Sequence, residues 1–414
     1  MKIKNLFLFF VFTSSFCLIT SYMFSQGTWT QKANFGGGIR GYATSFSIGT
    51  KGYIGTGDSG SYHVDFWQWD QAADVWTQKA DFAGVARWAA AGFSIGTKGY
   101  MGTGTSGGYL NDFWEYDPSL NTWTQKAGFA GTPRYAAVGF AIGTKGYIGT
   151  GCETGFFAYR NDFWEYDPAL NTWTQKANFG GTGRYGAVGF SIGTKGYIGT
   201  GMDGYTRKDF WEWDQATDTW TQKTDFGGTA RHSSTGFSIP LTGKGYIGTG
   251  WDGNIHQNDF WEWDQATDTW MQKANFAGVG RAYSTGFSIG YYGYIGTGED
   301  GTGQNYNKDF WEFDSGTTYI TESSDNNSCY VYPNPLTTQT TITLKNENEN
   351  ISLQLFTLSG KEVTTAINYS ENKIVIQRND LKSGIYFFCI NGSSTKEGDE
   401  RKVISSGKLI VLPY

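Results

Sequence analysis

Short runs in which apolar and polar residues alternate recur along most of the chain, with glycine-containing turns between them. In the run Lys208–Asp214, Trp211 and Trp213 share one side and the intervening residues share the other, which is the two-residue period of a β-strand. The same unit holds three more such runs, Tyr185–Ile192, Gly196–Thr200 and Thr219–Phe226. The pattern predicts an all-β protein built from four-stranded units.

The unit is repeated six times. A tryptophan that opens W-T-Q-K or a near copy recurs at steps of 47 or 50 residues, and an arginine follows it by 11 positions. The tryptophans are Trp29, Trp76, Trp123, Trp173, Trp220 and Trp270, and the arginines are Arg40, Arg87, Arg134, Arg184, Arg231 and Arg281. A period near ~50 residues with four strands per copy is typical of a propeller blade. The sequence therefore predicts a six-bladed β-propeller.

The two ends of the repeat array are incomplete in complementary ways. After the last D-F-W at Asp309, the position expected to hold a tryptophan holds Ile320, so the sixth unit lacks its own fourth strand. The chain opens instead with an unmatched fourth strand, Thr28–Phe35. We expect this strand to complete the last blade, because closing the ring removes exposed sheet edges.

Residues 1–25 resemble a signal peptide, with Lys2 and Lys4 before a short apolar run and Ser25 at the expected cleavage site. A membrane anchor is the alternative, and the interruptions in the apolar run disfavour it. No later run is long enough to span a membrane. The net charge of −6 gives no reason to expect nucleic acid as a partner.

The composition changes after the repeats. We expect the propeller to occupy residues 26–314, a polar linker 315–328, and a small β-sandwich 329–414. The sandwich strands are expected at Thr340–Leu344, Ser352–Leu358, Lys373–Gln377, Ile385–Ile390 and Lys408–Leu412. Cys329 and Cys389 both fall in this domain, and whether they pair is left open.

The repeat resembles the kelch repeat over residues 28–314, although a G-T-G triplet replaces the usual glycine doublet. The resemblance implies a kelch-like propeller and leaves the function open, because many functions share this fold.

The last domain resembles the C-terminal sorting domain of type IX secretion substrates. Four motifs carry the resemblance, and their residues include Tyr332, Pro333, Asn334, Pro335, Gly360, Gly384, Tyr386 and Lys408. Either Lys402-Val403 or Lys408-Leu409 is its basic–apolar ending. The resemblance implies the type IX secretion machinery as a partner and places the protein outside a Gram-negative cell, secreted or on its outer surface.

The six regularly spaced arginines have two readings, a ring that binds an acidic ligand or contacts that join neighbouring blades. We favour the second, because an asymmetric ligand cannot use six equivalent contacts equally. The same reasoning assigns the D-F-W aspartates and tryptophans to the scaffold.

A binding site is expected instead where the copies differ. The loops between the second and third strands vary, and they share one face of the propeller with the segments that follow the arginines. Mixed aromatic and polar side chains there suit a glycan or protein ligand. The candidates are Tyr42, His63, Trp88, Tyr109, Tyr135, Phe157, Tyr159, Tyr185, Tyr205, Arg207, His232, Trp251, Asp252, His256, Tyr283 and Tyr306.

Catalysis and metal binding have little support. Asp203, Asp252 and Asp300 each precede a glycine, which turn formation explains as well as calcium does. We therefore predict no cofactor and no metal, and assign no catalytic residue. The leading hypothesis is a secreted or cell-surface binding protein. The alternatives are a kelch-type sugar mutarotase or epimerase, using groups such as His232, Arg184 or Glu153, and a structural adhesion component.

Overall fold

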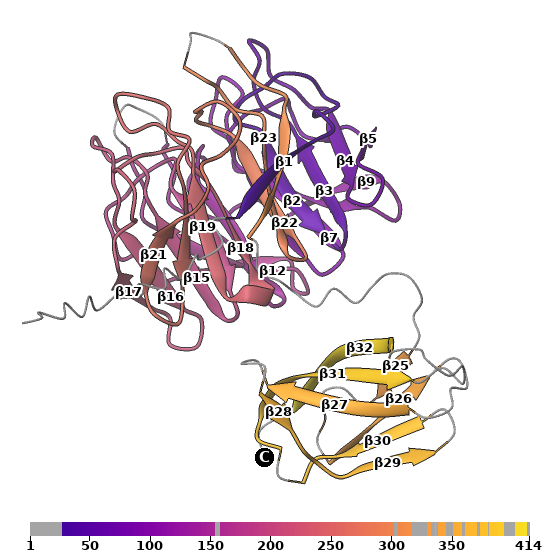
Figure 1. Ribbon diagram of the computed structural model, residues 1–414. Coiled ribbons are helices and arrows are strands. Elements are labelled where there is room, and N and C mark those ends of the chain that lie inside the picture. The colour runs from indigo at the N-terminus through magenta and orange to yellow at the C-terminus, as the bar shows by residue number, and fades with distance from the viewer. Residues whose placement is uncertain are drawn as a thin grey trace, which may run out of the picture. The chain divides into compact units, whose positions relative to one another are not determined.

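The computed structural model forms two compact units, one within residues 1–317 and one within 318–414, and each is described by itself (Figure 1). It describes residues 27–153, 158–301, 305–315, 329–332, 336, 338–344, 351–357, 361–370, 373–379, 381–392 and 402–411. The predicted signal peptide and, apart from Ser315, the predicted linker lie outside this set, so the exact domain boundaries stay predictions.

The first unit consists of six antiparallel four-stranded sheets, as the repeats predict. We number the sheets as blades 1 to 6. Blade 1 holds β2 (Thr44–Ile48), β3 (Lys51–Gly55), β4 (Phe66–Asp70) and β5 (Val75–Gln78). Blade 2 holds β6 (Ala91–Ile95), β7 (Lys98–Gly102), β8 (Phe113–Asp117) and β9 (Thr122–Lys126). Blade 3 holds β10 (Val138–Ile142), β11 (Lys145–Gly149), β12 (Phe163–Asp167) and β13 (Thr172–Lys176).

The second half of the propeller repeats this order. Blade 4 holds β14 (Val188–Ile192), β15 (Lys195–Gly199), β16 (Phe210–Asp214) and β17 (Thr219–Lys223). Blade 5 holds β18 (Thr235–Ile239), the 3-10 turn η1 (Pro240–Thr242), β19 (Lys244–Gly248), β20 (Phe260–Asp264) and β21 (Thr269–Gln272). Blade 6 holds β22 (Thr285–Ile289), β23 (Tyr292–Gly296), β24 (Phe310–Asp314) and, from the start of the chain, β1 (Thr28–Lys32).

The N-terminal strand closes the ring as predicted. β1 pairs antiparallel with β24, with Trp29 opposite Phe313. The Trp29 ring also lies 5.0 Å from the Phe260 ring of blade 5, edge to face. In Figure 1 the indigo β1 lies beside the orange strands of the last repeat. This strand therefore completes the last blade through backbone pairing, and its half-buried Trp29 ring adds a contact with blade 5.

The first strand of blade 4 begins later than predicted, at Val188 rather than Tyr185. Gly186 has a φ of +60°, a left-handed conformation that no regular strand contains, so the strand starts only after this residue. The third strand likewise begins at Phe210, not Lys208. Both of its faces carry a fully buried ring, Phe210 and Trp213, because a neighbouring blade covers each face.

A glycine in each second strand allows the blades to approach one another. A Cβ atom added at Gly52 would lie 2.1 Å from the Phe287 ring of blade 6. The same contact recurs in other blades, for example between Gly99 and Phe46. The glycine of the K-G-Y motif is therefore required by the inter-blade contact rather than by a turn.

The second unit is a sandwich of two four-stranded sheets, which confirms the predicted fold. One sheet holds β25 (Cys329–Tyr332), β26 (Gln339–Leu344), β30 (Lys373–Gln377) and β29 (Ile367–Ser370). The other holds β28 (Glu362–Val363), β27 (Ile351–Thr357), β31 (Gly384–Gly392) and β32 (Lys402–Val411). Ile342, Ile374, Leu355 and Phe388 are among the buried residues between the sheets.

The last strand is longer than the predicted Lys408–Leu412, and both candidate sorting endings lie in it. Cys329 and Cys389 belong to different sheets, and their pairing stays an open prediction. Among the residues that the structure describes, no helix is long and apolar enough to cross a membrane.

Candidate ligand-binding face

The six regularly spaced arginines are inter-blade supports, as favoured from the sequence. Each is at most 1% exposed and forms an ion pair with the aspartate of the D-F-W motif. Arg87 is representative: its guanidinium donates to both carboxylate oxygens of Asp112 at 2.6 Å and to the Thr103 carbonyl at 2.9 Å. It also lies 4.7 Å from the centre of the Phe82 ring, which follows the last strand of the preceding blade.

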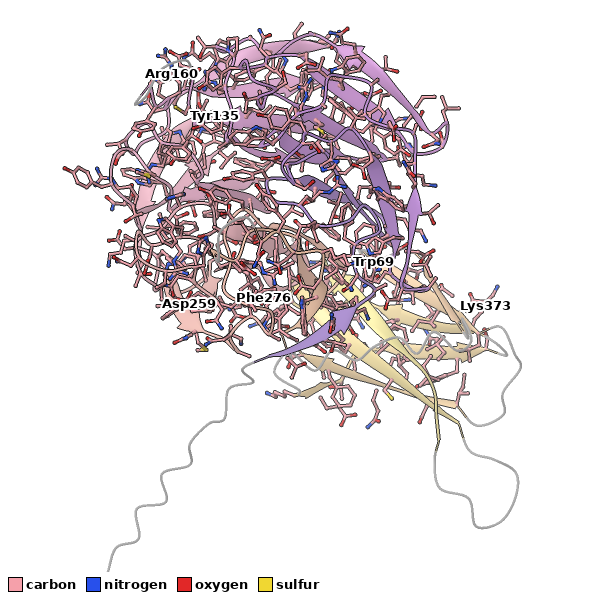
Figure 2. All side chains as sticks on the ribbon, turned by 90° about the horizontal axis from the view of Figure 1, so that it is seen from above. Trp69, Tyr135, Arg160, Asp259, Phe276 and Lys373 are labelled. Carbon is pink, nitrogen blue, oxygen red and sulfur yellow. The ribbon has the colours of Figure 1, made fainter. Side chains whose placement is uncertain are left out.

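The aspartate of each pair serves two partners. Asp112 also accepts a hydrogen bond from Trp114 Nε1 at 2.8 Å. Burial raises the pKa of its carboxyl, but the hydrogen bonds and the charge of Arg87 outweigh burial and lower it overall. Figure 2 labels Asp259, the equivalent carboxylate that pairs with Arg231, and Phe276, the equivalent ring that lies against Arg281. The D-F-W motif is thereby accounted for as scaffold.

The second residue after each arginine forms a ring of backbone hydrogen bonds around the propeller axis. In each, the N–H donates to the carbonyl of the equivalent residue in the preceding blade, at 2.7 to 3.0 Å. All six residues have φ between +50° and +60°. This backbone ring consists of Tyr42, Ala89, Ala136, Gly186, Ser233 and Tyr283. It holds the segments after the arginines at one level around the axis.

Six aromatic side chains, one from each blade, form a closed circle on this backbone ring. Successive ring centres lie 4.7 Å (Tyr42–Trp88), 5.3 Å (Trp88–Tyr135), 5.9 Å (Tyr135–Tyr185), 5.5 Å (Tyr185–His232), 6.1 Å (His232–Tyr283) and 3.9 Å (Tyr283–Tyr42) apart. We call this set the aromatic circle. His232 is buried, and the other five are half-buried.

Two blades contribute to the circle from a different position than the others. In blades 1 and 6 the first residue after the arginine is Gly41 or Ala282, and the aromatic residue comes one position later. A Cβ atom at Gly41 would lie 3.1 Å from the Tyr306 ring of blade 6. Tyr306 therefore takes up the space that an aromatic residue after Arg40 would need.

The variable loops meet the same segments. Bridges join Trp88 to Thr105, Tyr135 to Cys152, Tyr185 to Met202, His232 to Trp251, and Ala282 to Glu299. The structure thus brings the segments after the arginines and the variable loops to one face, as predicted. Around the circle, Tyr109 lies 5.6 Å from Tyr135 and Tyr159 lies 5.8 Å from Tyr185 (ring centres).

The remaining candidates lie farther out or are not described. Tyr205 is 77% exposed. His63 donates to or accepts from Ser59 Oγ at 2.7 Å, and the His256 ring lies 4.7 Å from that of Trp251. Phe157 lies outside the described residues. Arg207 forms an ion pair with Asp203.

Burial shifts the titration of the circle. It lowers the pKa of His232 to about 4, with a smaller contribution from His256, so the imidazole is neutral near pH 7. Burial also raises the pKa of Tyr42 and of Tyr283, and Glu299 adds to both shifts. The circle is therefore uncharged at neutral pH.

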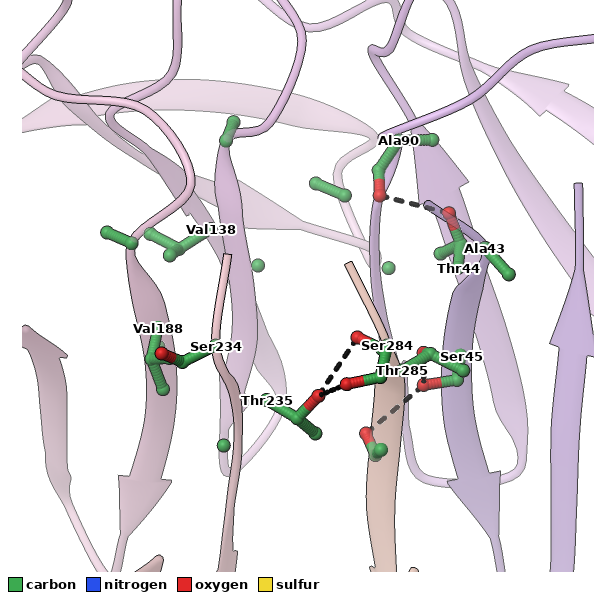
Figure 3. A pocket seen from close by; sticks show the side chains of 18 residues that line it. Ala43, Thr44, Ser45, Ala90, Val138, Val188, Ser234, Thr235, Ser284 and Thr285 are labelled. Carbon is green, nitrogen blue, oxygen red and sulfur yellow. Dashed lines mark hydrogen bonds between the residues drawn. The ribbon is translucent and has the colours of Figure 1, made fainter. Parts of the chain in front are cut away.

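Beneath the backbone ring lies an axial cavity of ≈ 160 Å³ (Figure 3). Three successive residues from each blade line it. Blades 1, 5 and 6 supply hydroxyls, whereas blades 2, 3 and 4 supply alanine, valine and glycine. The hydroxyls bond within the wall: Thr235 Oγ1 lies 2.6 Å from Ser284 Oγ, and Thr44 donates to the Ala90 carbonyl at 3.0 Å. The hydroxyl residues are Thr44, Ser45, Ser234, Thr235, Ser284 and Thr285.

Two of the three aspartates considered for calcium accept hydrogen bonds from nearby groups of the protein. Asp252 Oδ1 accepts from the backbone N–H groups of Asn254 and Ile255 at 2.8 and 2.9 Å. Asp203 accepts from Thr182 and Arg207. They come from different blades, and the described part of the chain contains no group of three metal-ligating side chains.

The groups named for a mutarotase are not available together. Arg184 is 1% exposed and ion-paired with Asp209, and Glu153 is ion-paired with Arg160. Figure 2 labels Arg160 and Tyr135 on this part of the molecule. Sequence reasoning missed Asp58 and Glu299, which border the circle, since an isolated acidic residue in a loop carries no pattern.

The sorting-signal residues are described only in part. Tyr386 is buried and donates to the Lys382 carbonyl at 2.9 Å, and Gly384 opens β31 with a φ of +154°. Lys408 pairs with Phe387 in the sheet, and Tyr332 ends β25. Pro333, Asn334, Pro335 and Gly360 lie outside the described residues.

Comparison with known proteins agrees with both halves of the chain. Residues 330–405 match the family model described as a secretion system C-terminal sorting domain. The fold is similar to the solved structure of YjhT, a kelch-like propeller, with 17% identity, a TM-score of 0.59, and coverage of 67% of this chain and 95% of that one. No curated protein matches the chain.

These findings define a kelch-like β-propeller with a C-terminal type IX sorting domain. The sorting domain directs the protein through the type IX secretion machinery to the outer cell surface or the extracellular space of a Gram-negative bacterium.

Proposed function

We propose that this protein is an exported binding protein whose propeller recognises a glycan or protein ligand with the aromatic circle. The observation that carries the proposal is the circle itself. Six rings from six blades close around the axis although their sequence positions differ between blades.

The circle is separate from the scaffold that holds the blades together. The scaffold arginines, aspartates and tryptophans are repeated in every blade, whereas the circle mixes tyrosine, tryptophan and histidine. Amphipathic rings of this kind give contact area at low cost in side-chain entropy. Variation on a fixed scaffold is the usual way in which repeat proteins acquire a ligand.

The test is a screen of the intact exported protein against a glycan array and against surface extracts, run in parallel with Trp88→Ala. We expect a ligand that the wild type retains and that Trp88→Ala binds at least tenfold more weakly. A folded protein that captures neither glycan nor protein would contradict the proposal. So would a ligand whose affinity is the same for both proteins.

A further inference from the structure

We propose that the aromatic circle binds uncharged sugar residues and discriminates against glycans that carry a carboxylate. This inference rests on the proposed binding function and adds the chemical class of the ligand. It follows from the geometry of the aromatic rings together with the distribution of charge on the propeller face that carries the variable loops, which we call the loop face.

The geometry suits a sugar ring. One face of a hexose presents several C–H bonds, which pack against the faces of aromatic rings, while its hydroxyls point outward to polar groups. Trp88 and Tyr135 are half-buried neighbours, with ring centres 5.3 Å apart. Tyr109 extends this surface, because its ring centre lies 5.6 Å from that of Tyr135.

The repeat arginines and the arginines of the variable loops all form ion pairs with carboxylates of the protein. The six repeat arginines are at most 1% exposed and pair with the D-F-W aspartates. The two arginines in the variable loops, Arg160 and Arg207, pair with Glu153 and Asp203. An acidic ligand would have to displace one of these carboxylates to obtain a bidentate contact.

Two lysines also belong to these loops. Both lie beside outer strands of their blades, away from the propeller axis. Lys208 and Lys308 are exposed and lie just before the third strands of blades 4 and 6. The first strands line the axis, so the lysines lie two strands farther out. They do not supply a cation to the aromatic circle.

Carboxylates border the circle on the side of blades 1 and 6. Glu299 is close enough to Tyr42, Tyr283 and Tyr306 to raise the pKa of all three. Asp58 Oδ2 lies 3.5 Å from the Tyr306 hydroxyl. Ionised carboxylates accept charge-assisted hydrogen bonds from sugar hydroxyls and repel a ligand carboxylate.

The histidine of the circle does not reverse this balance. His232 is 4% exposed and lies next to Ser233, with Nδ1 2.9 Å from the Ser233 hydroxyl. Because the imidazole is buried, it is neutral near pH 7 and offers no positive charge to a ligand. The circle therefore presents uncharged aromatic side chains to its ligand, and the carboxylates of Asp58 and Glu299 lie beside them as hydrogen-bond acceptors.

The experiment measures the affinity of the full-length protein for matched pairs of oligosaccharides by calorimetry. Each pair consists of a neutral core, such as N-acetyllactosamine or a cello-, malto- or manno-oligosaccharide, and the same core capped with sialic or glucuronic acid. We expect a neutral core to bind at least tenfold more tightly than its capped form, a difference of ~1.4 kcal/mol. Glu299→Gln should reduce that ratio below about threefold, because it removes one of the negative charges that border the circle.

A matched variant controls for net charge. Asp81→Asn removes the same charge from an exposed position after β5, the outermost strand of blade 1, and should leave the tenfold ratio intact. Capped glycans that bind as tightly as neutral ones overturn the inference. If no glycan of either kind binds, but the wild type binds a protein ligand that Trp88→Ala does not bind, the inference is wrong and the binding function stands. If nothing binds, both are wrong.

Discussion

The propeller uses arginine in two opposite ways, and the contrast separates scaffold from site. The six repeat arginines are buried between blades, each with a carboxylate, a carbonyl oxygen and an aromatic face around it. Arg207 lies in a variable loop, 40% exposed, with Asp203 four residues before it. The repeated contact holds the blades together, whereas the contact found once shapes a loop.

The same contrast holds for tryptophan. Trp76 packs between blades, with its ring 5.0 Å from Phe35 and its Nε1 donating to the Ala33 carbonyl at 2.9 Å. Trp88 belongs to the aromatic circle, whose other five members are tyrosine or histidine and come from two different positions after the arginine. The lesson is that in a repeat protein the most regular residues are the least informative about the ligand.

The largest effect is expected from breaking one buried ion pair. Arg134→Ala removes a fully buried guanidinium and leaves the half-buried Asp162 without its cation, and it should lower the free energy of unfolding by about 3–5 kcal/mol. The control Arg207→Ala breaks a surface pair and should cost about 0–1 kcal/mol. Chemical denaturation of both variants measures the difference. A loss below 1 kcal/mol for Arg134→Ala would refute the assignment of these arginines to the scaffold.

The two tryptophans provide a matched pair of identical substitutions. Trp76→Ala should destabilise the propeller by about 3–5 kcal/mol, because it removes a ring that is packed between blades. Trp88→Ala should cost about 1 kcal/mol in stability, since the ring contacts of Trp88 are with the half-buried Tyr42 and Tyr135, whereas Trp76 packs against a buried core cluster. For ligand affinity we expect the opposite order, with a larger loss in Trp88→Ala than in Trp76→Ala. Equal stability losses in thermal and chemical denaturation would remove the distinction between scaffold and circle.

His232 tests how much of the aromatic circle belongs to the folded core. Its pKa is lowered from 6.5 to about 4, so the unfolded chain takes up a proton at higher pH than the folded one. Its contribution to stability is complete above pH 6.5 and is lost as the pH falls toward 4. At pH 5 the loss reaches about 2 kcal/mol.

The variant for this test is His232→Tyr, which restores the residue found at the equivalent positions of blades 3 and 4. We expect the fall in unfolding free energy between pH 7 and pH 5 to be smaller in this variant than in the wild type. Denaturation curves at both pH values provide the measurement. An unchanged fall would mean that other groups carry the pH dependence.

The smallest effect concerns the two halves of the axial cavity. Thr235→Val copies Val138 and Val188 into the hydroxyl half and removes the hydrogen bond from Thr235 Oγ1 to the Ser284 carbonyl. It should cost about 0.5–1.5 kcal/mol. The reverse change, Val138→Thr, places a hydroxyl in the apolar half and should cost about 1–3 kcal/mol. Two neutral results would show that the asymmetry of the cavity has no energetic role.

Much of the fold could be read from the sequence because its determinants are local and repeated. The step between tryptophans predicted six blades, and the missing tryptophan at Ile320 predicted the closing role of Thr28–Phe35, of which Thr28–Lys32 forms the strand. The arginines were assigned to the scaffold by counting alone. Strand starts were less accurate: Tyr185 lies before the strand because Gly186 adopts a left-handed conformation that sequence does not display.

The sequence by itself determined the architecture, the closure of the ring and the sorting domain, since each depends on short patterns that recur or match a known family. The tertiary structure alone decided that one aromatic ring from each blade joins a single circle. Those rings come from two different positions relative to the arginine, and Glu299 and Asp58 join them from loops without a common pattern. Their proximity arises only when six blades meet at an axis, which no local stretch of sequence specifies.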